Sequence, residues 1–219
     1  MIPPGEKSAE QSQFNKDGLK DIFAEYPLTE EVADDLFKEV SSRYEAEGRH
    51  YHTLGHIVAV LDFLQKYKPE IKDWQAVKLA ILFHDIIYDT KSNSNEEDSA
   101  EYARQKLEEL NIDNKTIDEV RSLILATKTH EVVRGQDDSE IFLDADLSVL
   151  GSAERDYNDY AEKIRKEYAW VSEDKFRVGR RKVLEGFLSR PYIYFSESVR
   201  AELEEKARKN LQRELEKLN

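Results

Sequence analysis

Four short segments place histidine or aspartate within or beside an apolar stretch. They are RHYHTLGHI at 49–57, LFHDIIYD at 82–89, ILATKTH at 124–130 and LDADLSVLG at 143–151. A polar group buried in such surroundings is costly unless a cation or hydrogen bonds satisfy it. All five histidines of the chain lie between His50 and His130. Chemistry is therefore expected in the middle of the chain.

Two imidazoles and two carboxylates from these segments suit a first-row divalent metal ion. The candidates are His56, His84, Asp85 and one late aspartate. Two ligands from one helix and two from other segments would hold an octahedral ion and leave positions for water or phosphate. The residues alone leave the late aspartate open, because either Asp144 or Asp146 could instead cap a helix.

The elements that must position these residues are expected to be helices. Only 8 Gly and 5 Pro interrupt the chain, and no alternating strand pattern, repeat or linker is present. Helices are expected at 28–47, from 53 to the proline at 69, at 74–85, at 96–110, from 114 or 116 to 129, twice within 152–190 with a joint around 171–172, and at 196–218. Thr29, Thr53 and Asp73 are the expected N-caps. We expect a flexible N-terminus at 1–16 and a single all-α domain at 17–219.

Composition excludes several function classes. The formal net charge of −13 disfavours general nucleic-acid binding, although a local basic pocket could hold one small phosphorylated substrate. No apolar run approaches the roughly 20 residues of a membrane span, and the start of the chain lacks a signal-peptide pattern. The absence of cysteine excludes thiolate chemistry and fits a cytoplasmic location. The charged C-terminal helix could form a homodimer contact or a solvated face.

In their order along the chain, the four segments resemble the HD superfamily, whose pattern is H…HD…D. The similarity is closest to the bacterial family described as predicted metal-dependent HD phosphohydrolases, and it continues into GRRKVLEGFL and KARKNLQREL near the C-terminus. The motifs also resemble those of class I cyclic-nucleotide phosphodiesterases, with YHTLGH at 51–56, HD at 84–85, TKTH at 127–130 and ADLS at 145–148. The resemblance implies a helical HD-domain bundle.

The same resemblance assigns roles to individual residues. It implies that His56, His84, Asp85 and Asp146 are the metal ligands. It favours Asp146 over Asp144, and it makes His52 the counterpart of the phosphodiesterases' proton donor.

One departure from those enzymes concerns the number of metal ions. The phosphodiesterases continue HD as HD-x-D-H, whereas this chain has Ile86, Ile87 and Tyr88 after the pair. One principal divalent ion is therefore expected, with Mn, Mg, Co, Ni, Zn and Fe as candidates.

Other residues near the motifs are candidates for contacts with substrate. A weaker resemblance to alarmone hydrolases, which carry Glu-Asp after HD, makes Asp89 a candidate to orient the attacking water, and a solvated loop residue is the alternative. Arg49 and Lys128 are the best-placed cations for a phosphate, and His130 could bind substrate or a second ion. Arg180 and Arg208 could close the pocket or form buried pairs with glutamates.

These residues predict a metal-dependent phosphoric ester or anhydride hydrolase that uses metal-activated water. A bound divalent ion lowers the pKa of its water and polarises a phosphoryl oxygen, and His52 can protonate the leaving oxygen. The expected substrate is a small phosphorylated metabolite, with a nucleotide as a plausible member. Two alternatives remain: an HD-type di-iron oxygenase, for which only His130 offers an extra ligand, and a non-catalytic helical module that keeps a metal for stability.

Overall fold

The structure is a computed structural model that describes residues 14–133 and 135–218. Every regular element in these residues is helical, which confirms the predicted all-α class. The α-helices are α1 (Lys16–Ile22), α2 (Glu30–Tyr44), α3 (Leu54–Tyr67), α4 (Trp74–Phe83), α5 (Asn95–Glu109), α6 (Asn114–Ala126), α7 (Ser139–Asp146), α8 (Glu154–Glu167), α9 (Glu173–Ser189) and α10 (Glu197–Lys217). Two short 3-10 helices, η1 (Lys68–Glu70) and η2 (Leu147–Gly151), follow α3 and α7. Within the described ranges, no helix combines the length and apolarity needed to cross a membrane.

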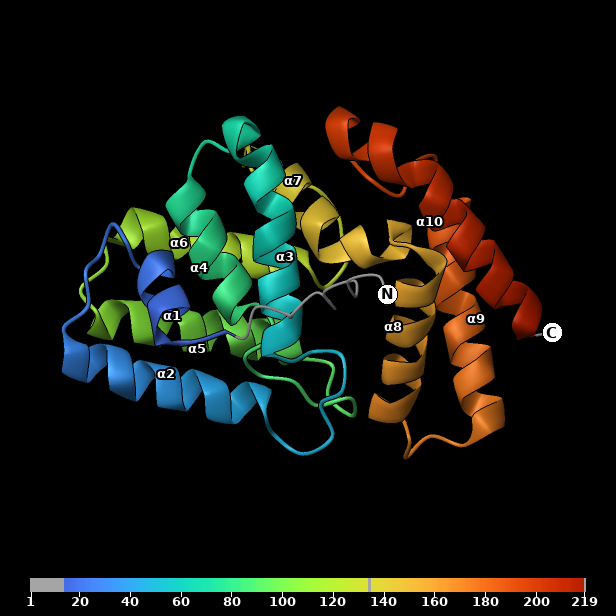
Figure 1. Ribbon diagram of the computed structural model, residues 1–219, viewed down its shortest axis with the longest axis horizontal. Helices are drawn as coiled ribbons and strands as arrows, with labels where there is room; N and C mark the ends of the chain where they lie inside the picture. Colours follow the sequence, from blue (N-terminus) through green and yellow to red (C-terminus); the bar gives the residue numbers. More distant parts are fainter. Residues whose placement is uncertain (1–13, 134, 219) are drawn as a thin grey trace, which may run out of the picture.

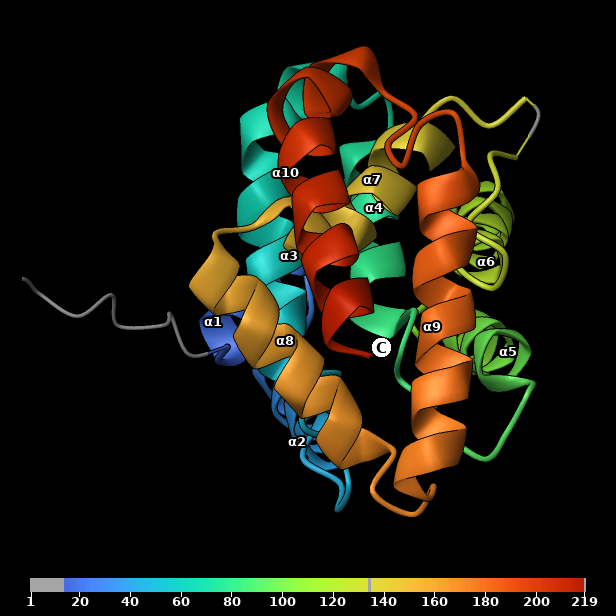
Figure 2. The same cartoon turned by 90° about the vertical axis from the view of Figure 1, so that its right-hand side faces the viewer.

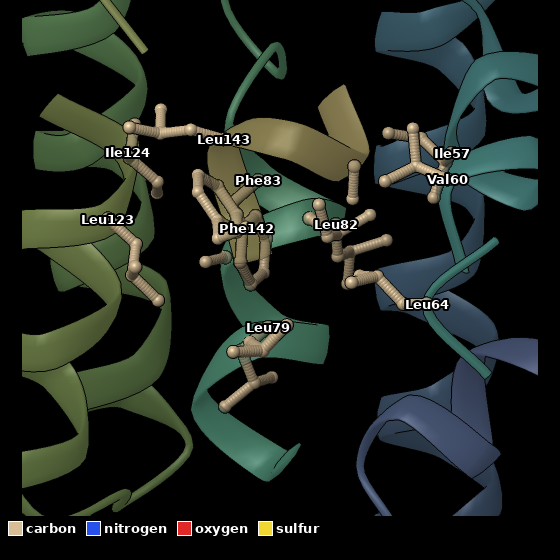
Figure 3. Packing of buried hydrophobic residues seen from close by; sticks show 14 of the residues in the cluster. Ile57, Val60, Leu64, Leu79, Leu82, Phe83, Leu123, Ile124, Phe142 and Leu143 are labelled. Atoms are coloured by element: carbon tan, nitrogen blue, oxygen red, sulfur yellow. The ribbon is translucent and has the colours of Figure 1, made fainter. Parts of the chain in front are cut away.

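Helix α4 is the centre of the core. Every residue of it from Gln75 to Phe83 is buried, as its nearly continuous apolar sequence predicts. Figure 3 shows Leu79, Leu82 and Phe83 of α4 lying between side chains of α6 on one side and α3 on the other. Phe142 of α7 packs in the same layer. The ends of α3, α4 and α7 are thereby fixed relative to one another.

The remaining helices lie on either side of α3 and α7 (Figure 1). α1, α2, α5 and α6 surround α4, whereas α8, α9 and α10 form a second group. Figure 2 shows α8, α9 and α10 in front of α3, α4 and α7. The side chains Val199, Leu203, Ala207 and Leu211 of α10 are buried, in agreement with the apolar face that its sequence predicts.

Local sequence explains most helix starts. Thr29 accepts a hydrogen bond from Val32 N at 3.3 Å, and Asp73 accepts one from Ala76 N at 2.8 Å, so both are N-caps as predicted. Thr53 occupies the N-cap position of α3, but its side chain makes no capping bond.

Several bounds differ from the prediction. The helix expected at 74–85 ends at Phe83, because His84 forms its C-cap, so Asp85 lies in the following turn. α6 begins at Asn114, and its N-cap is Asp113, which was not among the predicted caps. α1, α7 and η2 were not predicted at all. α7 is only 8 residues long, so its helical period is hard to recognise.

The described chain begins just before α1. Phe14 is buried and stacks on Phe37 with ring centroids 6.1 Å apart, and Asn15 caps α1 through Gly18 N. Of the segment expected to be flexible, 1–16, residues 1–13 lie outside the described residues. The boundary at residue 17 therefore stays a prediction.

A close contact and a buried carboxylate attach α10 to the centre of the molecule. A Cβ atom at Gly151 would lie 2.7 Å from Leu203 Cβ, so glycine is required where η2 meets α10. Asp144 is fully buried and accepts hydrogen bonds from Phe195 N and from Ser196 N and Oγ at 2.6–2.7 Å. Asp144 thus holds the segment that leads into α10, and it does not cap the helix that follows it in sequence.

Candidate metal centre

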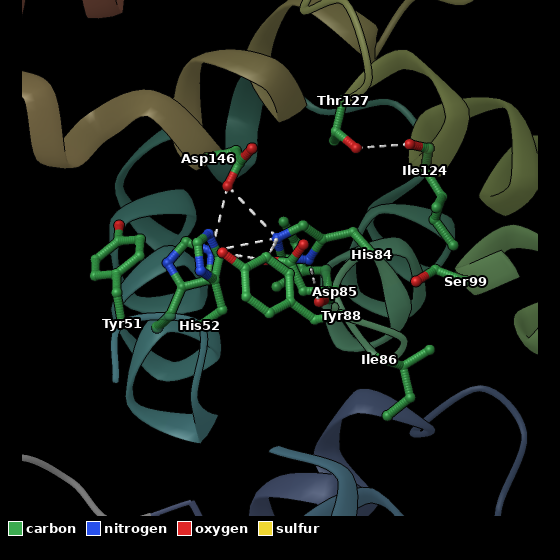
Figure 4. A network of polar contacts seen from close by, with 12 residues as sticks. Tyr51, His52, His84, Asp85, Ile86, Tyr88, Ser99, Ile124, Thr127 and Asp146 are labelled. Carbon is green, nitrogen blue, oxygen red and sulfur yellow. Dashed lines mark hydrogen bonds and ion pairs between the residues drawn. The ribbon is translucent and has the colours of Figure 1, made fainter. Parts of the chain in front are cut away.

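Three helix ends bring the H…HD…D residues together. His56 lies in the first turn of α3, His84 and Asp85 follow the last turn of α4, and Asp146 is the last residue of α7. Figure 4 shows the carboxylate of Asp146 pointing from α7 toward the imidazoles. One ligand atom from each of His56, His84 and Asp146 lies within 4.8 Å of the others, as in a metal site.

The separations fit one octahedral ion. His56 Nε2 lies 3.2 Å from His84 Nε2 and 3.2 Å from Asp146 Oδ1, and the latter two atoms are 3.5 Å apart. Asp85 Oδ2 is 3.0 Å from His84 Nε2 and 3.8 Å from His56 Nε2. Ligands at about 2.1 Å from an ion and at right angles to each other are about 3 Å apart. Asp85 therefore lies within reach of both histidines and is the proposed fourth ligand, whereas the cluster whose atoms all lie within 4.8 Å of one another consists of His56, His84 and Asp146.

A backbone contact prepares His84 for this role. Its Nδ1 lies 2.8 Å from the carbonyl oxygen of Ile81, so Nδ1 carries the proton and donates it. In the neutral ring, which is the form that binds a metal, the lone pair is then on Nε2, which faces the other three residues. Metal-binding histidines are commonly oriented by this kind of hydrogen bond.

The electrostatics of the centre favour a positive charge at its middle. Burial lowers the pKa of His84, but the charge of Asp85 and the hydrogen bonds to both carboxylates outweigh it and hold that pKa well above its ordinary value. Burial raises the pKa of Asp146, but hydrogen bonds from His130, His56 and His84 hold it well below the ordinary value. The carboxylates are therefore ionised and suited to a cation.

His52 lies beside the ligands and is held by Glu167. Its Nδ1 is 2.7 Å from Glu167 Oε2, and the other oxygen of Glu167 accepts hydrogen bonds from the backbone N–H groups of His50, Tyr51 and His52 at 2.7–3.0 Å. Tyr88 donates a further hydrogen bond to Oε2 at 2.9 Å, and its ring lies 4.3 Å from that of His52. The contact with Glu167 fixes the orientation of the His52 imidazole through Nδ1. Nε2 is the ring nitrogen that takes no part in this contact.

These contacts also set the charges of the pair. Burial lowers the pKa of His52, but the negative charges of Asp85 and Glu167 outweigh it, so the pKa is raised. Burial raises the pKa of Glu167, but the hydrogen bond and charge of His52 and the backbone N–H groups lower it to about 2. Glu167 is consequently a buried carboxylate that keeps a proton on His52.

Glu167 was missed by the sequence analysis, although a signal exists. Tyr157, Tyr160 and Ile164 form an apolar stripe along α8 at helical spacing, and Glu167 continues it after three more residues. A glutamate on an apolar stripe is a candidate for a buried partner. Its partner lies 115 residues earlier, so spacing alone could not identify it.

His130, a predicted contact for substrate or a second ion, lies next to Asp146. Its Nε2 is 3.1 Å from Asp146 Oδ2, the carboxylate oxygen that does not face His56 and His84. His130 has a φ of 47°, in the left-handed region. Arg190 donates hydrogen bonds to the carbonyl oxygens of Thr129 and His130 at 3.2 Å, which stabilises this turn.

A cavity of about 510 Å³ opens beside the centre. Its wall includes His52, His130 and Asp146, and most of the remaining lining is aromatic or aliphatic. This volume and this mixture of many apolar and few polar groups are typical of small-molecule sites. A substrate in the cavity would thus meet Asp146, one of the proposed ligands, together with His52 and His130.

Two cations on α9 line this cavity. Arg180 is buried, and Glu214 binds its Nε and Nη2 at 2.7 and 2.9 Å. Arg208 does not line the cavity; it pairs with Glu204 and donates to backbone carbonyls between α9 and α10. Lys175 is exposed and forms no hydrogen bond or ion pair with another described residue.

The structure corrects the predicted phosphate contact of Arg49. Its guanidinium donates to the carbonyl oxygens of His52, Asp85 and Ile86 at 2.8–3.1 Å. It also lies over the rings of two tyrosines, Tyr44 and Tyr88. Arg49 is therefore bound to the backbone behind the site and is not in the wall of the cavity. Its closeness to the motif in sequence did not show the direction of its side chain.

Lys128 and Asp89 are also placed away from the centre. Lys128 donates to Asn93 O at 2.8 Å and pairs with Glu97 on α5. Asp89 is exposed, and its carboxylate accepts a hydrogen bond from Lys91 N at 2.9 Å. Neither residue lines the cavity, and the contacts of both are with the segment 91–97.

Comparison with known proteins gives one match. A family model described as HD domain matches residues 53–162, which is just over half of the chain. The match includes the four proposed ligands and begins directly after His52. No curated protein and no solved structure is significantly similar to the chain.

Proposed function

The chain belongs to the HD-domain family, and we propose that it is a metal-dependent phosphohydrolase acting on a small phosphorylated metabolite. Most HD-domain proteins are metal-dependent phosphohydrolases. The observation that carries the proposal is that Asp146, a member of the His56, His84 and Asp146 cluster, lines the same cavity as the Glu167-bound His52.

The residues that would hold one divalent ion are His56, His84, Asp85 and Asp146. Two nitrogens and two carboxylate oxygens suit Mn, Mg, Co, Ni, Zn or Fe, and the separations fit a single ion. When bound, such an ion would activate a water molecule and polarise a phosphoryl oxygen. We propose one principal ion, since His130 is the only further histidine among the described residues with a hydrogen bond to the set.

His52 would protonate the leaving oxygen. It lines the cavity, its Nδ1 is held by Glu167, and its raised pKa favours the protonated form that an acid needs. A positioned general acid typically contributes about 100- to 10,000-fold to a rate. Glu167 acts through His52 as a positioning residue, because it orients the ring and stabilises its positive charge.

His130 and Lys175 are the proposed contacts for the phosphate-bearing substrate. His130 holds one oxygen of Asp146 and lines the cavity, while Lys175 offers an ammonium group in the cavity wall. They take the place of Arg49 and Lys128. A nucleotide is one plausible substrate, and a cytoplasmic location and a homodimer stay predictions.

The proposal is tested by joining metal analysis to a panel of phosphate esters and anhydrides. We expect the purified protein to bind one divalent ion per chain and to release phosphate or a phosphorylated product from at least one compound. A protein that consumes oxygen when loaded with iron, and hydrolyses nothing, would favour the di-iron oxygenase. Stable folding with bound metal and no turnover of any kind would favour the non-catalytic module.

A further inference from the structure

One wall of the cavity is a single face of α9. The residues of α9 in this wall recur at helical spacing: Lys175, Phe176, Gly179, Arg180, Val183 and Phe187. Val183 is 48% exposed although it is apolar. The apolar residues of this face, Phe176, Val183 and Phe187, are suited to contact the organic part of a substrate.

Gly179 is unusual within this face. It lies inside α9, where glycine destabilises a helix relative to alanine. A Cβ atom at this position would meet no heavy atom within 4 Å, so no contact inside the protein requires glycine. Gly179 lines the cavity, and the space beside its Cα is open. A ligand that lies close to the helix backbone would explain why the side chain is missing.

Aromatic rings form a large part of the cavity wall. Tyr160, Tyr168, Trp170 and Phe176 belong to its wall. Trp170 Nε1 donates a hydrogen bond to Thr90 Oγ1 at 2.7 Å, so the indole is held in position while 54% of the residue stays exposed. Aromatic side chains interact well with flat rings, in stacked or edge-to-face arrangements.

We propose that the group esterified to phosphate is a flat aromatic ring system that lies against the backbone of α9 at Gly179. The phosphate would then face Asp146 and His52, and the ring would contact the aromatic wall at Trp170 and Phe176. This inference rests on the proposed function. It adds that Gly179 determines specificity, because a side chain there would take the space of the ring but not that of the phosphate.

The test compares an aryl with an alkyl ligand in the metal-loaded protein. We expect 1-naphthylphosphonate, which is not hydrolysed, to bind more tightly than n-propylphosphonate and to quench the fluorescence of Trp170; Trp170→Phe should remove that signal. Gly179→Ala should weaken naphthylphosphonate binding about tenfold, because the added methyl group overpacks the ring, and change propylphosphonate binding less than about twofold.

Gly186→Ala is the matched control on the same helix. A Cβ at Gly186 also meets nothing within 4 Å, but Gly186 does not line the cavity. Both substitutions should raise Tm by about 1–4 °C, which shows that Gly179→Ala folds, and only Gly179→Ala should weaken aryl binding. Equal affinity for the two phosphonates, or unchanged aryl binding in Gly179→Ala, would overturn the inference. Failure of the proposed function would differ: aryl binding would follow the expected pattern without hydrolysis of any ester.

Discussion

Glu167 is joined to His52 through both of its carboxylate oxygens. Oε2 lies 2.7 Å from His52 Nδ1, and Oε1 accepts the backbone N–H of His52 at 3.0 Å. The two residues come from α8 and from the loop before α3, which only the fold brings together. This contact fixes the ring next to the proposed metal ligands and sets its charge.

The first prediction concerns His52 as the general acid. His52→Ala should keep its metal, because His52 is not among the ligands, and lose about 100- to 10,000-fold in kcat. Metal content by elemental analysis and turnover of an active ester would be measured on the same sample. Unchanged turnover would remove His52 from the mechanism.

The second prediction concerns pH. The acid is active when protonated, so kcat/KM should fall as the pH rises through the raised pKa of His52. Glu167→Gln removes a negative charge that raises this pKa, so the alkaline limb of the profile should move to lower pH. Glu162→Gln, an exposed position on the same helix, is the control and should leave the limb in place. A limb that does not move in Glu167→Gln would contradict the role of the pair.

The third prediction separates the two late aspartates. Asp146→Ala should lose metal binding and stay folded, since Asp146 is a proposed ligand at a helix end. Asp144→Ala should keep its metal and lose about 1–3 kcal/mol of unfolding free energy, because Phe195 N and Ser196 N lose their buried acceptor. Metal titration and urea unfolding would decide, and the opposite pattern would show that the roles are exchanged.

The fourth prediction concerns Arg49 and Lys128, the two predicted phosphate contacts that do not line the cavity. Arg49→Ala should lower the unfolding free energy by about 2 kcal/mol or more, because three carbonyl oxygens lose a charged donor. Lys128→Ala removes an exposed pair with Glu97 and should change stability by less than about 0.5 kcal/mol and leave KM unchanged. A large rise in KM for Lys128→Ala would restore its predicted phosphate contact.

The sequence predicts those residues of the site whose role follows from their immediate neighbours in the chain. His84 and Asp85 stand out because they follow an apolar run that can only be a buried helix. The structure brings them together with His56 and Asp146, as the ordered motifs predict. Arg49 and Lys128 were chosen for their closeness along the chain, which does not determine where a side chain points.

The parts that were missed depend on contacts between distant segments. Asp144 binds the backbone of a segment more than 50 residues later, and Glu167 meets a loop 115 residues earlier. α7 is too short for its period to be recognised, although it carries Asp146. All-helical architecture was predictable from composition and periodicity, whereas these pairings required the fold.

The most direct test of the account is the metal content and phosphate release of the wild type and Asp85→Ala, measured side by side. Asp62→Ala, an exposed carboxylate on α3, is the control. We predict one divalent ion per chain and measurable hydrolysis for the wild type and for Asp62→Ala, and the loss of both in Asp85→Ala. Full metal occupancy with unchanged hydrolysis in Asp85→Ala would contradict the assignment of the centre.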